Sequence, residues 1–240
     1  MPVKKGRNLL WISLAANVVF ILATVFVLTR KGGADILKND GVLGAEVYTN
    51  YYLQKKDIFE STASTNVDKI FIGDSITDHG EFQEFFPNEV VLNRGISKDT
   101  SKGVLNRINE ILARNPKEVY LLIGANDIRT KVDKATYIQN VENILKSFGH
   151  TDTEVYVQSI LPVNNSIYGN KIKNETVMEF NVALKETAEK HNVHFIDLFP
   201  HFLDEHGQLK KEYTLDGLHL LGEGYKVWVN QVNQNSSIVQ

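Results

Sequence analysis

The chain has 240 residues, of which 42% are hydrophobic and 23% are charged, as in globular and not in disordered proteins. The absence of cysteine excludes a disulfide framework, a thiolate zinc site and a cysteine nucleophile. All 29 acidic residues, but only 21 of the 26 basic ones, lie after residue 31, so that part carries a net charge of −8. Because such an acidic domain binds nucleic acid poorly, we expect no nucleic-acid partner.

The first predicted element is a membrane-spanning helix at residues 9–28, LLWISLAANVVFILATVFVL. This run carries no charge, and at 1.5 Å per residue it would span about 30 Å, the thickness of a bilayer's hydrocarbon core. It is longer than the apolar core of a cleaved signal peptide, and no small-residue cleavage site follows it. We therefore expect an uncleaved signal anchor.

Charges beside the apolar run predict its orientation. Three basic residues and the amino terminus precede the run, and two basic residues follow it. The positive-inside rule then favours a single-pass protein of the cell membrane, with a cytoplasmic N-terminus and an extracellular remainder. We expect residues 1–30 to form the cytoplasmic tip and anchor, and residues 31–66 a linker and an amphipathic helix. The helix is predicted at residues 44–61, with Tyr51 and Ile58 on one face and Tyr52 and Phe59 beside it.

Residues 67–240 are predicted to form the main domain, in which short apolar runs alternate with helical patterns. The apolar runs lie at residues 69–72, 90–92, 119–123, 155–158 and 194–196. Apolar residues at helical spacing recur between them, in sets beginning at Leu105, Ile138 and Val177, and a last set begins at Tyr225. Apolar strands that alternate with helices indicate a parallel sheet covered on both faces. We predict a flavodoxin-like, three-layer α/β/α fold with a five-stranded parallel sheet and a ligand site at the carboxyl ends of its strands.

Polar residues follow the predicted strands, where such a site would lie. The segments that follow are GDS at 73–75, NRGISKD at 93–99, GAND at 124–127, SILPVNN at 159–165 and, after a long loop, DGLH at 216–219. We expect these segments to meet at one edge of the sheet. Together they supply a hydroxyl, an imidazole, a carboxylate and amide donors, which are the groups that a serine hydrolase needs.

The GDS, NRG, GAND and DGLH segments resemble, in this order, the four sequence blocks of the GDSL-type esterases, also called SGNH hydrolases. The resemblance extends over residues 68–232 and implies an ester hydrolase that works through an acyl-enzyme. One departure is Lys98, where many relatives have glycine. We expect no cofactor, because the first loop lacks the glycine pattern of a nucleotide-binding site. We also expect no metal, because no cluster of histidines and carboxylates accompanies Asp127.

Ser75, His219 and Asp216 are the predicted catalytic residues. Ser75 would be the nucleophile at a strand end, and His219 the base that takes its proton. Asp216 precedes His219 by three residues in a glycine-containing loop, so its carboxylate can reach the ring nitrogen remote from Ser75 and fix the tautomer. The alternatives are ordinary helix caps at Ser75 and Asp216. His79 is a rival base, but it lies four residues from Ser75 on the same predicted helix.

Ser75, Gly95 and Asn126 are the predicted oxyanion donors, through two backbone N–H groups and one side-chain amide. Glycine at position 95 would permit close approach of the backbone. The alternative is a simple turn at Gly95 and at Asn126. Asp74 and Asp127 are predicted to support the surrounding loops. Asp74 could also suggest a phosphatase nucleophile, but the expected D-x-D pattern is absent.

The sequence and the resemblance together predict a membrane-anchored extracytoplasmic ester hydrolase. An outward-facing domain favours removal of O-acetyl or other short acyl groups from cell-surface carbohydrate. The alternatives are a lysophospholipase or thioesterase that cleaves lipid acyl esters, and a glycan O-acyltransferase. A binding protein on an inactive hydrolase scaffold is disfavoured, because no triad residue is missing.

Overall fold

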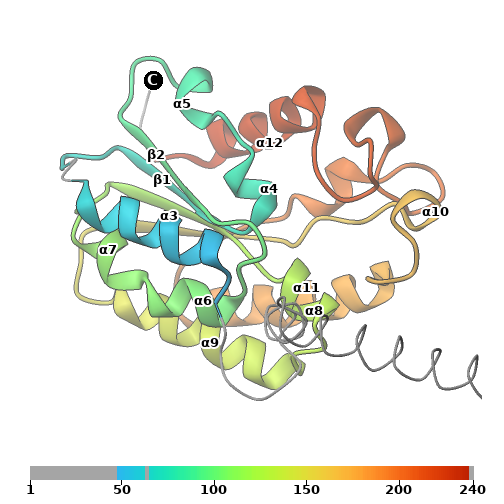
Figure 1. Ribbon diagram of the computed structural model, residues 1–240, viewed down its shortest axis with the longest axis horizontal. Helices are drawn as coiled ribbons and strands as arrows, with labels where there is room; N and C mark the ends of the chain where they lie inside the picture. The colour runs from blue at the N-terminus through green and yellow to red at the C-terminus, as the bar shows by residue number, and fades with distance from the viewer. Residues whose placement is uncertain (1–47, 63–64, 238–240) are drawn as a thin grey trace, which may run out of the picture. The chain divides into compact units, whose positions relative to one another are not determined.

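The computed structural model describes residues 48–62 and 65–237, which contain a five-stranded parallel sheet (Figure 1). Its strand order is β2-β1-β3-β4-β5, and every neighbouring pair is parallel. The strands are β1 (Lys69–Gly73), β2 (Val91–Gly95), β3 (Glu118–Leu122), β4 (Glu154–Gln158) and β5 (His194–Ile196). The predicted five-stranded parallel α/β fold is confirmed. The order reverses between β1 and β3, which places a ligand site at the carboxyl ends of the central strands.

Helices cover both faces of the sheet, because side chains of each buried strand point alternately to opposite faces. Ile70 and Ile72 belong to the apolar cluster that includes α6, α7, α9 and α11, whereas Phe71 belongs to the cluster that includes α4, α5 and α12. Figure 1 shows these two sets of helices on opposite sides of the strands. The helices are α3 (Asn50–Ser61), α4 (Ser75–Asp78), α5 (Phe82–Phe85), α6 (Ser101–Asn106), α7 (Ile108–Leu112), α8 (Ala125–Arg129), α9 (Lys134–Ser147), α10 (Asn165–Tyr168), α11 (Asn174–Lys190) and α12 (Gly222–Asn235), with 3₁₀ turns η1 (Phe199–Phe202) and η2 (Lys211–Tyr213).

Stacked aromatic rings fill the face beneath α5 and α12. The ring of Phe71 stacks on Phe82 at 3.8 Å between centroids and on Tyr120 at 5.1 Å, and Trp228 meets Phe71 edge-on at 6.2 Å. All four side chains are fully buried. Each buried aromatic side chain removes a large apolar area from water, so this cluster fixes β1, and with it the start of α4, against the rest of the domain.

Helix α3 begins at Asn50, later than predicted, and buries one of its two rows of apolar side chains. Tyr52 and Phe59 are buried, whereas Tyr51 and Ile58 are 43% and 54% exposed. The Tyr52 hydroxyl donates to the carbonyl of Gly103 at 2.8 Å, at the first turns of α6. The prediction that this helix packs on the domain agrees with these contacts, and of the two predicted rows of apolar residues the one with Tyr52 and Phe59 is buried.

The predicted membrane anchor, residues 9–28, lies outside the described residues, as does most of the predicted linker. Within residues 48–62 and 65–237, no helix combines the length and the hydropathy that crossing a bilayer requires.

Candidate active site

Ser75 stands at the point where β1 ends and α4 begins. Asp74 caps this helix, since its carboxylate accepts a hydrogen bond from the Ile76 N–H at 3.0 Å. Gly73 must be glycine, because a Cβ atom there would lie 2.3 Å from the carbonyl oxygen of Leu122 and 2.2 Å from Thr77 Oγ1. The N–H of Ser75 lies in the first turn of α4 and donates to no group within the described chain.

The structure brings Ser75 and His219 together, although 144 positions separate them. Ser75 Oγ lies 2.9 Å from His219 Nε2, and His219 Nδ1 lies 2.6 Å from Asp216 Oδ2. An ionised carboxylate only accepts hydrogen bonds, so Nδ1 carries the proton and Nε2 is left to accept from the Ser75 hydroxyl. This is the geometry of a nucleophile with its base and of the base with its orienting carboxylate.

The Asp216 carboxylate is held by its own loop. Its Oδ1 accepts from the backbone N–H groups of Leu218 at 2.9 Å and His219 at 2.8 Å. Burial raises the pKa of Asp216, but the hydrogen bonds from the His219 ring and from these two N–H groups outweigh burial and lower the pKa to about 2. The carboxylate is therefore ionised throughout the neutral range and stabilises a positive charge on the neighbouring imidazole.

Gly217 lets this loop turn against the segment that follows β4. Its φ angle is +83°, and a Cβ atom would lie 2.7 Å from the carbonyl oxygen of Asn164 and 2.8 Å from the Tyr168 nitrogen. The N–H of Asn164 donates to the Gly217 carbonyl at 2.8 Å. The segments at 159–165 and 216–219 therefore converge, as the sequence predicts, and the first holds the second in place.

The N–H of Gly95, predicted to be an oxyanion donor, is not free. Its N–H donates to Asn93 Oδ1 at 2.7 Å, so this group is already engaged. A Cβ atom on Gly95 would lie 2.1 Å from the Asp78 nitrogen, which shows that glycine here permits β2 to pack on α4. The prediction of Gly95 as an oxyanion donor does not fit this geometry.

Lys98 supplies the free backbone N–H that the sequence analysis assigned to Gly95. Lys98 lies in the loop after β2 in the left-handed conformation, with φ of +69°. Its N–H donates to no group in the part of the chain that the structure describes. Ser97 on one side is bonded to Asp78 on α4, and the carbonyl of Asp99 on the other accepts from Asn126 at 3.0 Å. The sequence signal that could have pointed to this residue was the one noted above: many relatives have glycine at position 98, and glycine favours the left-handed conformation that Lys98 adopts.

The Asn126 side chain, at the start of α8, is oriented from both ends. Its Nδ2 donates to the Asp99 carbonyl and lies 3.5 Å from Asp74 Oδ2, in the turn between β1 and α4. Its Oδ1 accepts from Arg129 Nε at 3.1 Å, which fixes the amide with its NH₂ group facing the turn. Arg129 is a second residue that sequence reasoning missed, three positions after Asn126 on the same helix.

Three buried aspartates, Asp74, Asp99 and Asp127, lie in or near the turn between β1 and α4. Burial raises the pKa of Asp74 to about 7, although the Ile76 N–H opposes this, and nearby Asp99 and Asp127 raise it further. Burial likewise raises the pKa of Asp99 to about 6 against its ion pair with Arg107 at 2.9 Å. Burial also raises the pKa of Asp127, whose oxygens accept from the N–H and hydroxyl of Ser101. Asp74 thus contacts the first turn of α4, and Asp127 contacts the first residue of α6; their predicted role in supporting these loops stays a prediction.

His79, the rival base, lies beside His219 without replacing it. The two ring centroids are 5.0 Å apart, and Ser75 Oγ is bonded to the ring of His219. Within the described residues, no group of three or more histidines or carboxylates is arranged to hold a metal ion.

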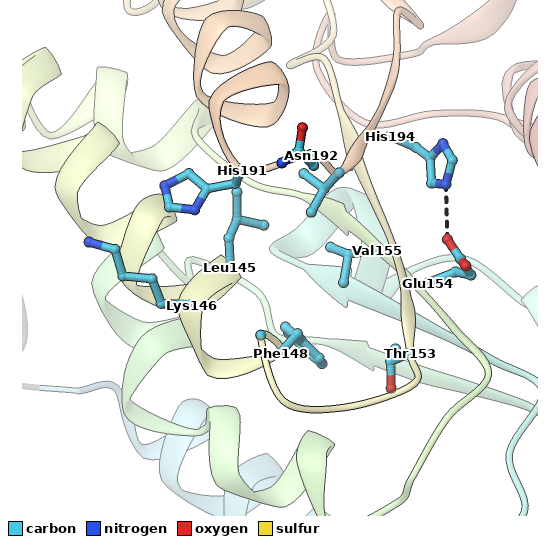
Figure 2. A pocket seen from close by; sticks show the side chains of 11 residues that line it. Leu145, Lys146, Phe148, Thr153, Glu154, Val155, His191, Asn192 and His194 are labelled. Carbon is cyan, nitrogen blue, oxygen red and sulfur yellow. Dashed lines mark hydrogen bonds and ion pairs between the residues drawn. The ribbon is translucent and has the colours of Figure 1, made fainter.

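A hollow at the opposite edge of the sheet offers no comparable chemistry (Figure 2). It lies near the first residues of β4 and β5, where His194 Nε2 meets Glu154 Oε2 at 2.9 Å. His191 and Lys146 also line it, and its one hydroxyl among the described lining residues, that of Thr153, donates to the Pro116 carbonyl at 2.8 Å and not to an imidazole. The candidate for covalent chemistry is therefore the carboxyl edge, with Ser75.

A parallel α/β sheet with a hydrogen-bonded Ser–His–Asp chain at its carboxyl edge has the architecture of a serine hydrolase. The chain belongs to the GDSL-like Lipase/Acylhydrolase family, whose sequence model matches residues 71–227. The resemblance inferred from the sequence blocks is confirmed, and the family is one of lipases and acylhydrolases by its description.

The chain is also similar to several individual proteins. A solved structure from Streptococcus pneumonia, provisionally named a platelet activating factor, is 30% identical, with a TM-score of 0.72, covering 84% of this chain and 97% of that chain. The chain is also 26% identical over 160 residues to the isoamyl acetate-hydrolyzing esterase of Saccharomyces cerevisiae, covering 59% of this chain and 66% of that protein. It is 27% identical over 186 residues to the N-acylneuraminate cytidylyltransferase of Escherichia coli O18:K1:H7, covering 75% of this chain but only 42% of that protein.

Proposed function

We propose that this chain hydrolyses carboxylic esters through an acyl-enzyme on Ser75, with His219 as general base and Asp216 as its orienting partner. The observation that carries the proposal is the chain of two hydrogen bonds, 2.9 Å from Ser75 Oγ to His219 Nε2 and 2.6 Å from His219 Nδ1 to Asp216 Oδ2. A serine hydroxyl is a weak nucleophile until a base takes its proton. The neutral Nε2 that Asp216 enforces is such a base.

Each proton has a defined path in this reaction. Ser75 Oγ bonds to the acyl carbon while its proton moves to His219 Nε2, and the carbonyl oxygen becomes an oxyanion. The oxyanion re-forms the carbonyl, the bond to the alcohol breaks, and the alcohol leaves with the proton from Nε2. A water molecule then attacks the acyl-enzyme by the same route, releasing the acid and restoring Ser75. The ionised Asp216 stabilises the imidazolium in both halves.

The oxyanion would be bound by the N–H of Ser75, the N–H of Lys98 and the NH₂ group of Asn126. The first two groups have no partner in the described chain, and the third is oriented by Arg129 and Asp99. Loss of one such donor costs about 10²–10³ in rate in other hydrolases. These donors are neutral, so they work without titrating.

For the substrate we propose a short acyl ester, above all an O-acetyl group on cell-surface carbohydrate. The name of the yeast relative describes hydrolysis of an acetate ester, and the Escherichia coli relative is named for a sugar acid. The apolar run at residues 9–28 supports a membrane anchor, with the catalytic domain on the outer side. Such a tether holds the site near surface glycans.

The proposed chemistry is tested by turnover of p-nitrophenyl acetate by the full-length protein in detergent. We expect Ser75→Ala and His219→Ala each to lower kcat/KM by at least about 10³-fold, as for other residues of such triads. Turnover by Ser75→Ala equal to that of the unaltered protein would exclude this nucleophile.

Two further measurements test the substrate and the location. Acetate release from acetylated polysaccharide, compared with fatty-acid release from a lysophospholipid, separates the carbohydrate proposal from the lipid alternative, and acylated sugar formed with a sugar acceptor present would indicate transfer. Protease added to intact cells should remove the catalytic domain; full protection would place it in the cytoplasm.

A further inference from the structure

Asp78, at the last turn of α4, is held by helix α3. The Tyr51 hydroxyl donates to Asp78 Oδ2 at 2.7 Å, and Lys55 Nζ lies 2.8 Å from Asp78 Oδ1. The Asp78 side chain is only 4% exposed, so these are largely shielded, charge-assisted contacts, which are stronger than neutral ones.

The same carboxylate also holds the loop after β2. Asp78 Oδ2 accepts from the Ser97 N–H at 3.1 Å and from the Ser97 hydroxyl at 2.7 Å. The carboxylate thus meets four donors from Tyr51, Lys55 and Ser97, three of them on Oδ2 and one on Oδ1. Asp78 therefore joins three elements: α3, the nucleophile helix α4 and the loop that carries Lys98.

Lys98, the next residue in this loop, needs such support. A residue with a side chain in the left-handed conformation costs of order 1–3 kcal/mol and persists only where its surroundings hold it there. The two hydrogen bonds from Ser97 to Asp78 hold the residue that precedes Lys98, through its N–H and its hydroxyl. The direction of the free Lys98 N–H thus depends on where Asp78 is held.

Helix α3 lies outside the family match, which begins at residue 71. It is nevertheless anchored to the domain at a second point, since the carbonyl of Phe59 accepts a hydrogen bond from Arg114. A helix fixed at both ends, with two donors on Asp78, can determine the position of that carboxylate.

We propose that α3 is a working part of this active site: Tyr51 and Lys55 hold Asp78, and Asp78 positions the Lys98 N–H as an oxyanion donor. The proposal rests on the proposed function. Tyr51, Lys55 and Asp78 are positioning residues, because in this proposal they act through the Lys98 N–H and not on the substrate directly. They act on the transition state more than on the ground state, since the oxyanion forms only during attack.

The test compares Tyr51→Phe, Lys55→Gln and the double variant in the full-length protein, with p-nitrophenyl acetate as substrate. Tyr51 and Lys55 lie near the surface, so both variants should fold. We expect the double variant to lose about 10-fold in kcat with little change in KM, less than the 10²–10³ for removal of an oxyanion donor. Lys55→Arg should retain most of the activity. Lys56→Gln, which removes the neighbouring lysine paired with Glu60, is the matched control and should match the unaltered protein.

A tetrahedral inhibitor separates positioning from simple stability. Methylboronic acid bound to Ser75 mimics the oxyanion, so its inhibition constant should rise by about the same factor as kcat falls. Unchanged kcat and unchanged inhibition in the double variant would overturn the proposal, as would a loss of thermal stability alone. Failure of the proposed function is distinguishable, because Ser75→Ala would then be as active as the unaltered protein.

Discussion

Asp74 has a buried carboxyl group next to Ser75, and burial disfavours its charged form. The substitution Asp74→Asn should therefore raise the free energy of unfolding at neutral pH. Burial raises the pKa of Asp74 from 3.8 to about 7. Each pKa unit corresponds to about 1.4 kcal/mol, so the folded state at pH 7 and above is destabilised by about 4 kcal/mol relative to one with a neutral side chain here. Asparagine retains an oxygen to accept from the Ile76 N–H.

The pH window follows from the two pKa values. Between pH 3.8 and 7 the folded protein holds a proton on Asp74 that the unfolded chain has released, so the contribution of Asp74 to stability falls as pH rises through this range. Urea unfolding of the purified protein in detergent, followed by tryptophan fluorescence, measures the free energy of unfolding from pH 4 to 8. The gain from Asp74→Asn should be near zero below pH 4 and about 4 kcal/mol at pH 7 to 8.

Two results would refute this reasoning. An equal gain in the free energy of unfolding at all pH values would mean that asparagine improves packing and that the pKa of the Asp74 carboxyl is not raised. A loss of stability at pH 8 would mean that the ionised carboxylate is the stabilising form. Asp57→Asn, on the exposed side of α3, is the control and should leave stability unchanged at every pH.

Two further predictions concern the loops around Ser75. Lys98→Gly should raise the free energy of unfolding by up to about 1 kcal/mol, because glycine adopts φ of +69° without strain. The kcat should be unchanged, because the backbone N–H of residue 98 remains. A large loss of kcat would show that the lysine side chain takes part in the reaction. Arg129→Gln should lower kcat about fivefold, because the Asn126 amide loses the donor that orients it, and this factor corresponds to one hydrogen bond of about 1 kcal/mol. Lys134 is exposed, so Lys134→Gln is the control and should have no effect in the same ester assay.

The fold could be predicted because its determinants are local in sequence. Apolar runs at 69–72 and 119–123 form buried strands, and a chain that alternates such runs with amphipathic helices has few other ways to bury them. The position of Ser75 at the carboxyl edge could be predicted for a related reason, since it follows a strand directly, whereas DGLH comes after a long loop and was placed at this edge by the resemblance of its sequence block.

The rest depends on contacts that sequence spacing does not encode. Gly95 ends β2 and Lys98 lies three residues later in the loop that follows, and only the backbone path shows that the N–H of the first is engaged while that of the second is free. On α3, the buried face includes Tyr52, whereas the neighbouring Tyr51 reaches an aspartate 27 positions away. Both tyrosines fit the same helical pattern, so the choice between them is made by the surface on which the helix packs.

The central claim is that the hydroxyl of residue 75 becomes acylated. Its most direct test is to treat the full-length protein with an alkyl fluorophosphonate, which traps activated serine nucleophiles, and to locate the adduct by peptide mass spectrometry. We expect one adduct, on Ser75, with loss of esterase activity in proportion to labelling, and no adduct in Ser75→Ala or His219→Ala. Complete labelling at another residue together with loss of activity, or full esterase activity in a protein fully labelled at Ser75, would contradict this account.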